Sequence, residues 1–221
     1  IHIAGVAFSA GDGHRVAFMQ QFGGVAAADD GGQAQLAADD GGVGGAAAVV
    51  GHDGGGWPGT FLDLGSALDH LQVLGRGYRL DLERIVALGH SSGGHFAAWL
   101  AVRNQLPPDS DIRGDPKISL AGVVLADAFI DPRVMDSKGL DGALFCGEPV
   151  LVRLLGGDPD ASPDRLREIS PLQWLPWGIP QIYVISSRRY PVHPARPLAD
   201  GRTTMVMPDY PALSRDAGDA C

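Results

Sequence analysis

Residues 84–100 read RIVALGHSSGGHFAAWL, and this stretch decides the fold. Its first five residues are an apolar run of strand length, which is typical of a buried parallel strand. Phe96 and Leu100 are among the apolar residues that follow, and they predict a helix from Gly93 to Asn104. A strand followed at once by Gly-x-Ser-x-Gly and a helix predicts a nucleophile elbow with Ser91 at its apex.

The chemistry of such an elbow explains both of its glycines. Ser91 must sit on a sharp, strained turn at the carboxyl end of the strand, so that Oγ projects into the crevice. Side chains at Gly89 and Gly93 would collide with the neighbouring strand and helix. The helix N-terminus favours a developing oxyanion, and the backbone N–H of Ser92 is the predicted donor to it. A serine that merely caps a helix does not require glycine on both sides.

Helix and strand alternate through the rest of the middle part. Phe61, Leu64, Leu68, Leu71 and Leu74 recur at the spacing of an amphipathic helix. We predict strands at Ile118–Leu125 and Pro180–Ser186, a polar loop over 107–117 and a helical segment around 151–155. This order predicts an α/β fold with a mostly parallel sheet covered on both faces. The length of 221 residues suits a single domain over residues 1–221.

The two ends of the chain look incomplete or irregular. Residues 1–50 are rich in Gly, Ala and Asp, and only Val16–Phe22 and Ala46–Val50 favour regular structure. We interpret Gly41–Gly45 as a flexible loop rather than a phosphate cradle, because no strand precedes it. Five prolines interrupt residues 187–221, except at Thr203–Met207, which we predict to be an edge strand.

Composition narrows the classes of partner. A net charge of -9 argues against a nucleic-acid partner, and no apolar run reaches the ~18 residues that a membrane span needs. Cys146 and Cys221 are interpreted as free thiols, which fits a cytoplasmic location. No His, Cys and Asp cluster has metal-ligand spacing, so we expect neither a metal nor another cofactor. The sequence fixes no oligomeric state.

Several motifs together resemble a known family. They are GGGWPGT at 54–60, LDHL at 68–71, LDLERI at 80–85, GHSSGGH at 89–95 and SPL at 170–172. Over roughly residues 51–186 the chain resembles the esterase and kynurenine formamidase-like branch of the α/β hydrolases. This resemblance implies a small-molecule substrate, either a carboxylic ester or an N-formyl amide of an aromatic amine, and hydrolysis through an acyl-enzyme on Ser91.

The nucleophile needs a histidine base and an acid that orients it, in the chain order Ser, acid, His. His95 lies one helical turn after Ser91 and is expected to be structural, so His193 is the candidate base. The family places its acid after the strand that ends at Ser186, where this chain has no carboxylate. Asp131 is our candidate acid and Asp127 the alternative, and loop or capping roles for both stay open.

The missing motifs are those expected in the flanks. The family's early His-Gly-Gly, a source of oxyanion N–H groups, has no counterpart beyond His2 to Gly5. We hypothesise that residues near 3–50 and after about 187 are translated out of frame. Read one base later, Ser187–Tyr190 can encode His-Gly-Asp, the usual neighbourhood of the acid, and Ala4–Gly13 can encode a tract like the one after the family's His-Gly-Gly.

Three functions therefore stay open. The chain is an active esterase or formamidase, an impaired or inactive relative that acts as a binding module, or a nucleotide binder that uses its glycine-rich segments. The elbow and the Gly54–Thr60 motif argue against the third. Residues 132–178, with Trp174 and Trp177, are interpreted equally well as a cap over the site or as core packing.

Overall fold

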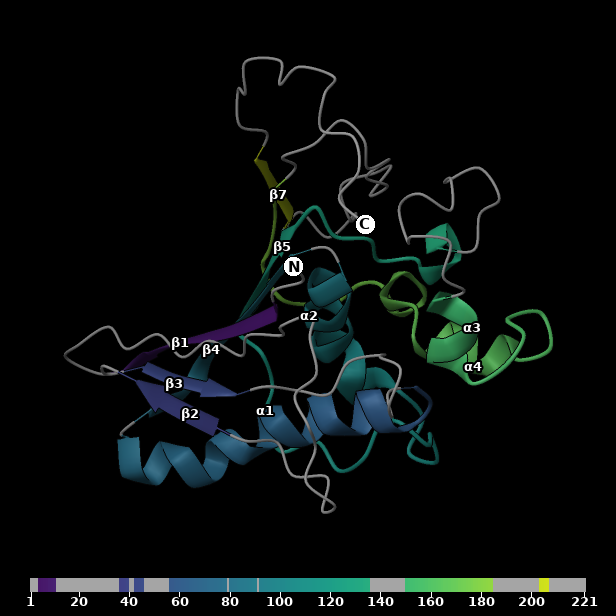
Figure 1. Cartoon of the computed structure of the whole chain (residues 1–221). Coiled ribbons are helices and arrows are strands. Elements are labelled where there is room, and N and C mark those ends of the chain that lie inside the picture. Colours follow the sequence, from purple (N-terminus) through teal and green to yellow (C-terminus); the bar gives the residue numbers. More distant parts are fainter. Residues whose placement is uncertain are drawn as a thin grey trace.

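The computed structural model describes residues 4–10, 36–39, 42–45, 56–78, 80–90, 92–135, 150–184 and 203–206. The strands of its main sheet are β1 (Ala4–Ala10), β4 (Leu80–His90), β5 (Gly122–Ala126), β6 (Gln181–Val184) and β7 (Thr203–Val206). They lie in the order β1-β4-β5-β6-β7 (Figure 1). β1 is antiparallel to β4, whereas the other neighbours are parallel. The predicted α/β fold with a mostly parallel sheet is confirmed.

The strands differ from the predicted ones mainly at their starts. β4 begins at Leu80 rather than at Arg84, because β1 pairs with it as far as Leu80, past a shift in register. β5 begins four residues later than the predicted strand, at Gly122. Just before it, the N–H of Ala121 donates to the carbonyl of Ile85 (2.7 Å). β7 is the last strand of the sheet, which confirms the predicted edge strand.

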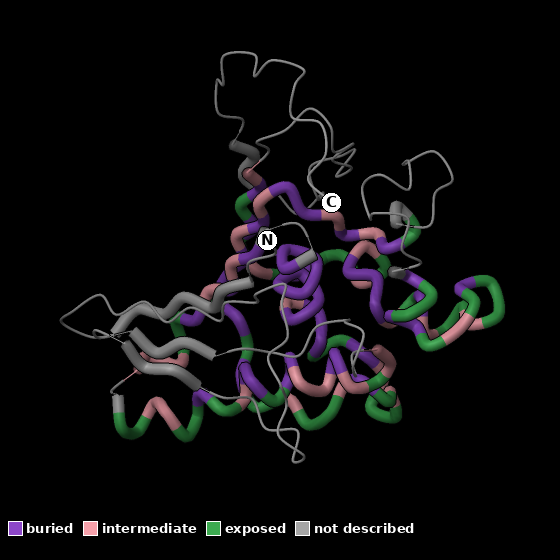
Figure 2. Tube along the Cα trace, viewed as in Figure 1, coloured by how far each residue is buried: buried purple, intermediate pink, exposed green. Residues whose placement is uncertain are grey.

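The helices follow the apolar patterns closely. α1 (Gly59–Tyr78) and α2 (Ser92–Val102) are where the sequence places them, and the 3-10 turn η1 (Arg103–Gln105) continues α2. Residues 93–100 of α2 are all buried (Figure 2). α3 (Val150–Leu155) confirms the helical segment predicted around 151–155. Beyond β5 lie η2 (Pro132–Met135), α3 (Val150–Leu155), α4 (Pro163–Glu168) and η4 (Pro171–Trp174).

Successive side chains of the central strands point to opposite faces of the sheet, and the two faces are buried to different extents. The face covered by α2 is buried, with Ala87, Val123, Leu125 and Tyr183 among its side chains. On the opposite face Val86, Leu88 and Val124 are half-buried, and Ile182 is 39% exposed. Within the described ranges the expected helical cover is therefore present on one face only.

The helices lie on one face because α1 and α2 pack against each other. The ring of Phe61 in α1 lies 4.8 Å from that of Trp99 and 5.9 Å from that of Phe96, both in α2. All three side chains are nearly inaccessible to solvent. Such aromatic pairs contribute about 1 kcal/mol each beyond the area they bury. α1 therefore extends the layer that α2 begins, and both helices belong to the same hydrophobic core as the central strands.

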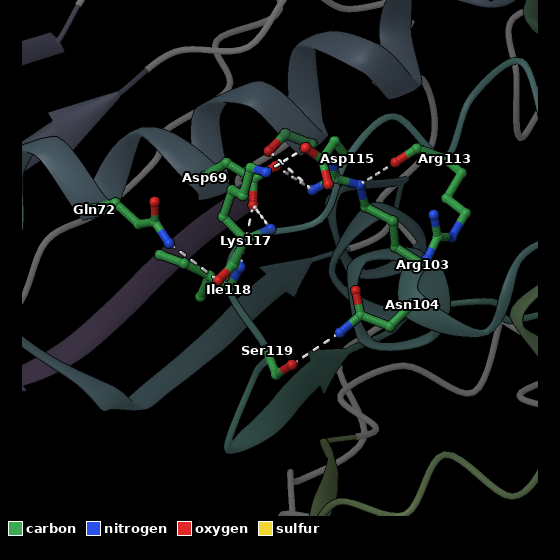
Figure 3. Close-up of polar contacts among 10 residues, drawn as sticks. Asp69, Gln72, Arg103, Asn104, Arg113, Asp115, Lys117, Ile118 and Ser119 are labelled. Atoms are coloured by element: carbon green, nitrogen blue, oxygen red, sulfur yellow. Dashed lines mark hydrogen bonds and ion pairs between the residues drawn. The ribbon is translucent and has the colours of Figure 1, made fainter. Parts of the chain in front are cut away.

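Figure 3 shows the polar network that fastens α1 to the segment before β5. Arg103 is buried, and its guanidinium lies 2.8 Å from the carboxylate of Asp69 and donates to the carbonyl of Arg113 (2.7 Å). The other oxygen of Asp69 accepts from the backbone N–H groups of Lys117 (2.8 Å) and Ile118 (3.2 Å). A buried charge is tolerated only with such partners. The network fixes where the chain enters β5.

Two interpretations of the flanks need correction. Residues 1–50 hold more regular structure than predicted, because β1 pairs with β4 and because β2 (Leu36–Asp39) and β3 (Gly42–Gly45) form an antiparallel pair. The prediction of a flexible loop at Gly41–Gly45 is thus wrong for Gly42 to Gly45. Backbone pairing needs no side chains, so paired glycines did not prevent it. Val16–Phe22 and Ala46–Val50 lie outside the described residues.

The tryptophans of the 132–178 segment take part in packing. Trp177 is 4% exposed, and its indole N–H donates to the carbonyl of Pro171 (3.0 Å). Trp174 is half-buried and donates to the carbonyl of Arg167 (3.1 Å), whose guanidinium lies 5.1 Å from the indole ring. These contacts favour the core-packing interpretation over the cap for both residues.

Candidate active site

The joint between β4 and α2 has the close approach that an elbow demands. β4 ends at His90 and α2 begins at Ser92, so one residue, Ser91, separates strand from helix. A Cβ added to Gly89 would lie 2.1 Å from the carbonyl oxygen of Gly93. No side chain fits in that space, because real Cβ atoms are not found at such distances from backbone. The collision that the sequence predicts for a side chain at position 89 is therefore present in the structure.

A further glycine, which the sequence analysis did not single out, holds α2 against the chain that leaves β5. A Cβ on Gly94 would lie 2.3 Å from the Cβ of Ala128 and 3.0 Å from the carbonyl oxygen of Gly89. The helix therefore touches both the end of its own strand and the segment after the next strand. The doubled glycine in the GHSSGGH motif is the signal that marks this contact.

Ser92 is the first residue of α2. The first N–H groups of a helix have no carbonyl partner within it, and the helix dipole places partial positive charge there. This position suits the predicted oxyanion donor. Ser91 itself and His193 lie outside the described residues, as do Cys146 and Cys221.

Three neighbouring strands end in one row. His90 pairs with Ala126, and Ala126 pairs with Val184, at the carboxyl ends of β4, β5 and β6. In open parallel sheets, ligands bind in the crevice beyond these ends. The residues that come next along the chain are Ser91 after β4 and Asp127 after β5. The structure thus places the alternative acid one strand away from the strand end that precedes the predicted nucleophile.

Asp127 has unusual backbone geometry. Its φ is 43°, in the left-handed region, and the residue is only 3% exposed to solvent. Its N–H donates to the carbonyl of Val184 (2.8 Å), which extends the contact with β6 by one residue. A left-handed non-glycine residue costs roughly 1–3 kcal/mol and persists where the surroundings enforce it. Such residues are concentrated at functional sites.

Asp131, the predicted acid, has a different setting. It is half-buried and lies four residues further along, immediately before η2. One of its carboxylate oxygens accepts the backbone N–H of Arg133 at 3.0 Å. This is the arrangement of an aspartate that caps a helical turn, which was the simpler role left open for it.

His95 is built into the core. It is 1% exposed, its Nδ1 lies 3.2 Å from the carbonyl oxygen of Phe129, and the two rings stack at 5.2 Å. Burial lowers the pKa of His95 from 6.5 to about 4, although the nearby carbonyls of Phe129 and Ile169 oppose the shift. Within the described residues no hydrogen bond reaches Nε2. A buried imidazole with so low a pKa is a poor general base at neutral pH, which supports the structural role predicted for it.

The comparison with protein families identifies the chain. The family model BD-FAE matches residues 52–195, which is about two-thirds of the sequence. The chain belongs to the BD-FAE family. The matched region contains the whole elbow, both candidate acids and the candidate base. It also includes nearly all of the segment over which the sequence motifs resemble α/β hydrolases.

Solved structures confirm the α/β-hydrolase fold of this BD-FAE chain. It is similar to a bifunctional GH43-CE protein from Bacteroides eggerthii, with a TM-score of 0.55, 21% identity and coverage of 75% of this chain and 26% of that one. An inhibited esterase B from Lactobacillus rhamnosis is similar with a TM-score of 0.56 and 18% identity, and the match covers 76% of this chain and 55% of that one. A propionate-bound esterase, Est2, from the Planctomycetes species Thermogutta terrifontis is similar with a TM-score of 0.50 and 23% identity, and the match covers 76% of this chain and 60% of that one. The chain thus spans about a quarter to three-fifths of these structures.

No curated protein matches the chain significantly. In the described ranges, no helix combines the length and the apolar character needed to cross a membrane. The same residues contain no group of three His, Cys, Asp or Glu side chains that could hold a metal ion.

Proposed function

We propose that this BD-FAE protein is a serine hydrolase that cleaves a carboxylic ester through an acyl-enzyme on Ser91. One observation carries the proposal: the space between β4 and α2 excludes a side chain at position 89, with a single residue between strand and helix. A serine that only caps a helix has no need of this close approach. A nucleophile elbow does, because the nucleophile must stand clear of the sheet.

The reaction follows the logic of an activated serine. Ser91 Oγ attacks the acyl carbon while its proton passes to His193, the proposed base. The N–H of Ser92 donates to the oxyanion that forms. The alcohol leaves with the proton from the histidine, and a water molecule then releases the acid by the same steps. Asp131 or Asp127 orients the histidine, and no cofactor takes part.

The substrate is proposed at two levels. A small-molecule ester is the main proposal, and a short acyl group is a reasonable first probe because the similar Thermogutta terrifontis esterase holds propionate. The N-formyl amide of an aromatic amine is the finer alternative, which rests on the resemblance of the GGGWPGT and GHSSGGH motifs to formamidase-like enzymes. Both bonds yield to the same nucleophile, so the elbow does not discriminate between them. We further propose a cytoplasmic location.

Covalent labelling with a fluorophosphonate tests the nucleophile directly. The reagent forms a bond between phosphorus and Ser91 Oγ and loses fluoride, and peptide mass spectrometry locates the adduct. We expect labelling of Ser91 in the native chain and none in Ser91→Ala. Ser66→Ala is the matched control, because Ser66 lies exposed on α1 and should leave labelling unchanged.

Hydrolysis of p-nitrophenyl propionate and of formanilide then separates the two substrate classes. Turnover of the ester that disappears in Ser91→Ala supports the esterase, and turnover of formanilide supports the formamidase. A folded chain that neither labels nor hydrolyses either compound would instead be the inactive relative. The missing His-Gly-Gly and the absent acid after Ser186 favour that second candidate, since losing one oxyanion donor costs about 100- to 1000-fold in rate.

A further inference from the structure

We infer that Asp127, rather than Asp131, is the carboxylate that orients the base of this site. The inference rests on the proposed hydrolase function and concerns a positioning residue, because the carboxylate acts through the histidine. Four features of Asp127 carry it: its place in the row of strand ends, its rigid surroundings, its burial and its backbone conformation.

The place of Asp127 follows from strand register. His90 and Ala126 are partners, so Asp127 leaves the sheet beside the strand end that precedes Ser91. Neighbouring strands are about 4.8 Å apart. One imidazole spans the gap between a serine on one strand end and a carboxylate on the next, with a hydrogen bond at each nitrogen. Asp131 lies beyond a further turn of chain, towards η2 rather than at the strand ends.

The segment that carries Asp127 is held at four successive residues. The N–H of Asp127 bonds to the carbonyl of Val184, and Ala128 packs against Gly94. The carbonyl of Phe129 is 3.2 Å from Nδ1 of His95. The carbonyl of Ile130 accepts the N–H of Leu172 (3.1 Å). A group that orients a catalytic base must be positioned within a fraction of an ångström, and such anchoring supplies that precision.

The anchoring also connects Asp127 with the nucleophile. Gly94 and His95, which hold Ala128 and Phe129, both belong to α2, the helix that begins immediately after Ser91. The segment that carries the candidate acid is therefore fixed relative to the helix that follows the candidate nucleophile in the sequence. Asp131 has no comparable connection among the described contacts, and its carboxylate is engaged by the N–H of Arg133.

Burial and conformation separate a functional aspartate from an incidental one. Asp127 keeps a carboxylate at a residue that is only 3% exposed, so the position is well shielded from water. It also holds φ at 43°, where glycine would be free of strain. A chain that needed only a turn here would be more stable with glycine. Retaining aspartate at a φ where glycine would be free of strain is explained if the carboxylate has a function at the strand ends.

The test compares steady-state hydrolysis of p-nitrophenyl propionate by the native chain, Asp127→Asn and Asp131→Asn across pH 5–9. Asparagine tolerates the left-handed region, so the Asp127→Asn backbone should be preserved. We expect kcat to fall by about 10⁴-fold with KM nearly unchanged, since the base then adopts the wrong tautomer. The inflection of the rate profile should move to lower pH, because the charge that stabilises the imidazolium is gone.

The matched control is Asp109→Asn, at an exposed aspartate before β5, which should leave kcat and the inflection in place. For the rival acid, the inference predicts that Asp131→Asn lowers kcat by no more than a few-fold. If Asp127→Asn does not fold, Asp127→Gly replaces it, because glycine accepts this φ without strain. The inference is overturned if both Asp127 variants keep kcat and the inflection, or if Asp131→Asn shows the loss instead. Native hydrolysis that survives in Ser91→Ala would overturn the proposed function itself, which is a distinguishable result.

Discussion

Nδ1 of His95 lies 3.2 Å from the carbonyl oxygen of Phe129, while the two rings stack with centroids 5.2 Å apart. The carbonyl can only accept, so the Nδ1 of His95 carries the proton and donates it. The contact joins the helix after the nucleophile to the segment after β5. It also makes the stability of the fold depend on the protonation state of one buried ring.

That dependence gives a pH prediction. The folded-state pKa of His95 is about 4, below its ordinary value of 6.5, so the unfolded chain binds more protons between these values. The free energy of unfolding should therefore be highest above pH 6.5 and fall as the pH drops towards 4, by roughly 3 kcal/mol from this residue. Urea unfolding at pH 7, 5.5 and 4.5 measures it. His95→Gln should show a shallower pH dependence, and identical slopes would refute the assignment.

A second prediction concerns the elbow glycine. Gly89→Ala should abolish cooperative folding or cost more than about 4 kcal/mol, because its Cβ meets backbone atoms that cannot move away. Gly77→Ala is the control: it lies in α1, and no atom lies within 4 Å of the added Cβ. That change should stabilise the chain by about 0.5–1 kcal/mol. Thermal unfolding of both variants decides the matter, and an unaffected Gly89→Ala would show that the strand and helix are not so close.

A third prediction separates buried from exposed charge. Asp69→Asn leaves the guanidinium of Arg103 buried without its ion pair, so it should lower the free energy of unfolding by about 3–5 kcal/mol. Asp115→Asn removes the partner of Lys117 at a side chain that is 82% exposed, and should leave the free energy of unfolding nearly unchanged, because water and salt screen exposed ion pairs. Denaturant titrations of the two variants are directly comparable. Equal effects would mean that the Arg103 network contributes little.

The fourth prediction concerns the coding DNA. The BD-FAE match begins at residue 52, close to the boundary placed at residue 50, and ends at 195, eight residues past the boundary near 187. Translation in the other two frames should give a His-Gly-Gly segment before residue 50 and a His-Gly-Asp segment near residue 187. A continuous family-like sequence in no alternative frame would end the hypothesis. Sequencing the gene is sufficient to decide.

The sequence predicted the elements whose own residues specify them. Helix α1 follows from the spacing of Phe61 to Leu74, and the elbow follows from glycines around one serine after an apolar run. The hairpin of β2 and β3 was missed, because its glycines discourage any local structure. Its Asp-Gly at positions 40 and 41, a dipeptide typical of two-residue hairpins, was the overlooked signal.

The candidate site was predictable only in part, because its geometry depends on contacts between distant residues. The contact of Asp127 with Val184 follows from the register of β5 with β6, and no local pattern reveals either this contact or the left-handed φ of Asp127. The same is true of Gly94, whose neighbour is Ala128. The role of Asp131 as a cap could have been read from the Asp-Pro that starts η2.

The one-sided cover of the sheet has a consequence for how the protein can change. Within the described ranges, α2 is the main layer over the central strands, and it is also the helix that follows the nucleophile and anchors the segment of Asp127. A substitution in this helix that changes the reactivity of Ser91 is therefore expected to change core packing too. A substitution that improves core packing is in turn expected to change the reactivity. Selection or engineering would have to alter the two properties together, so improved variants should arise from paired substitutions rather than from single steps.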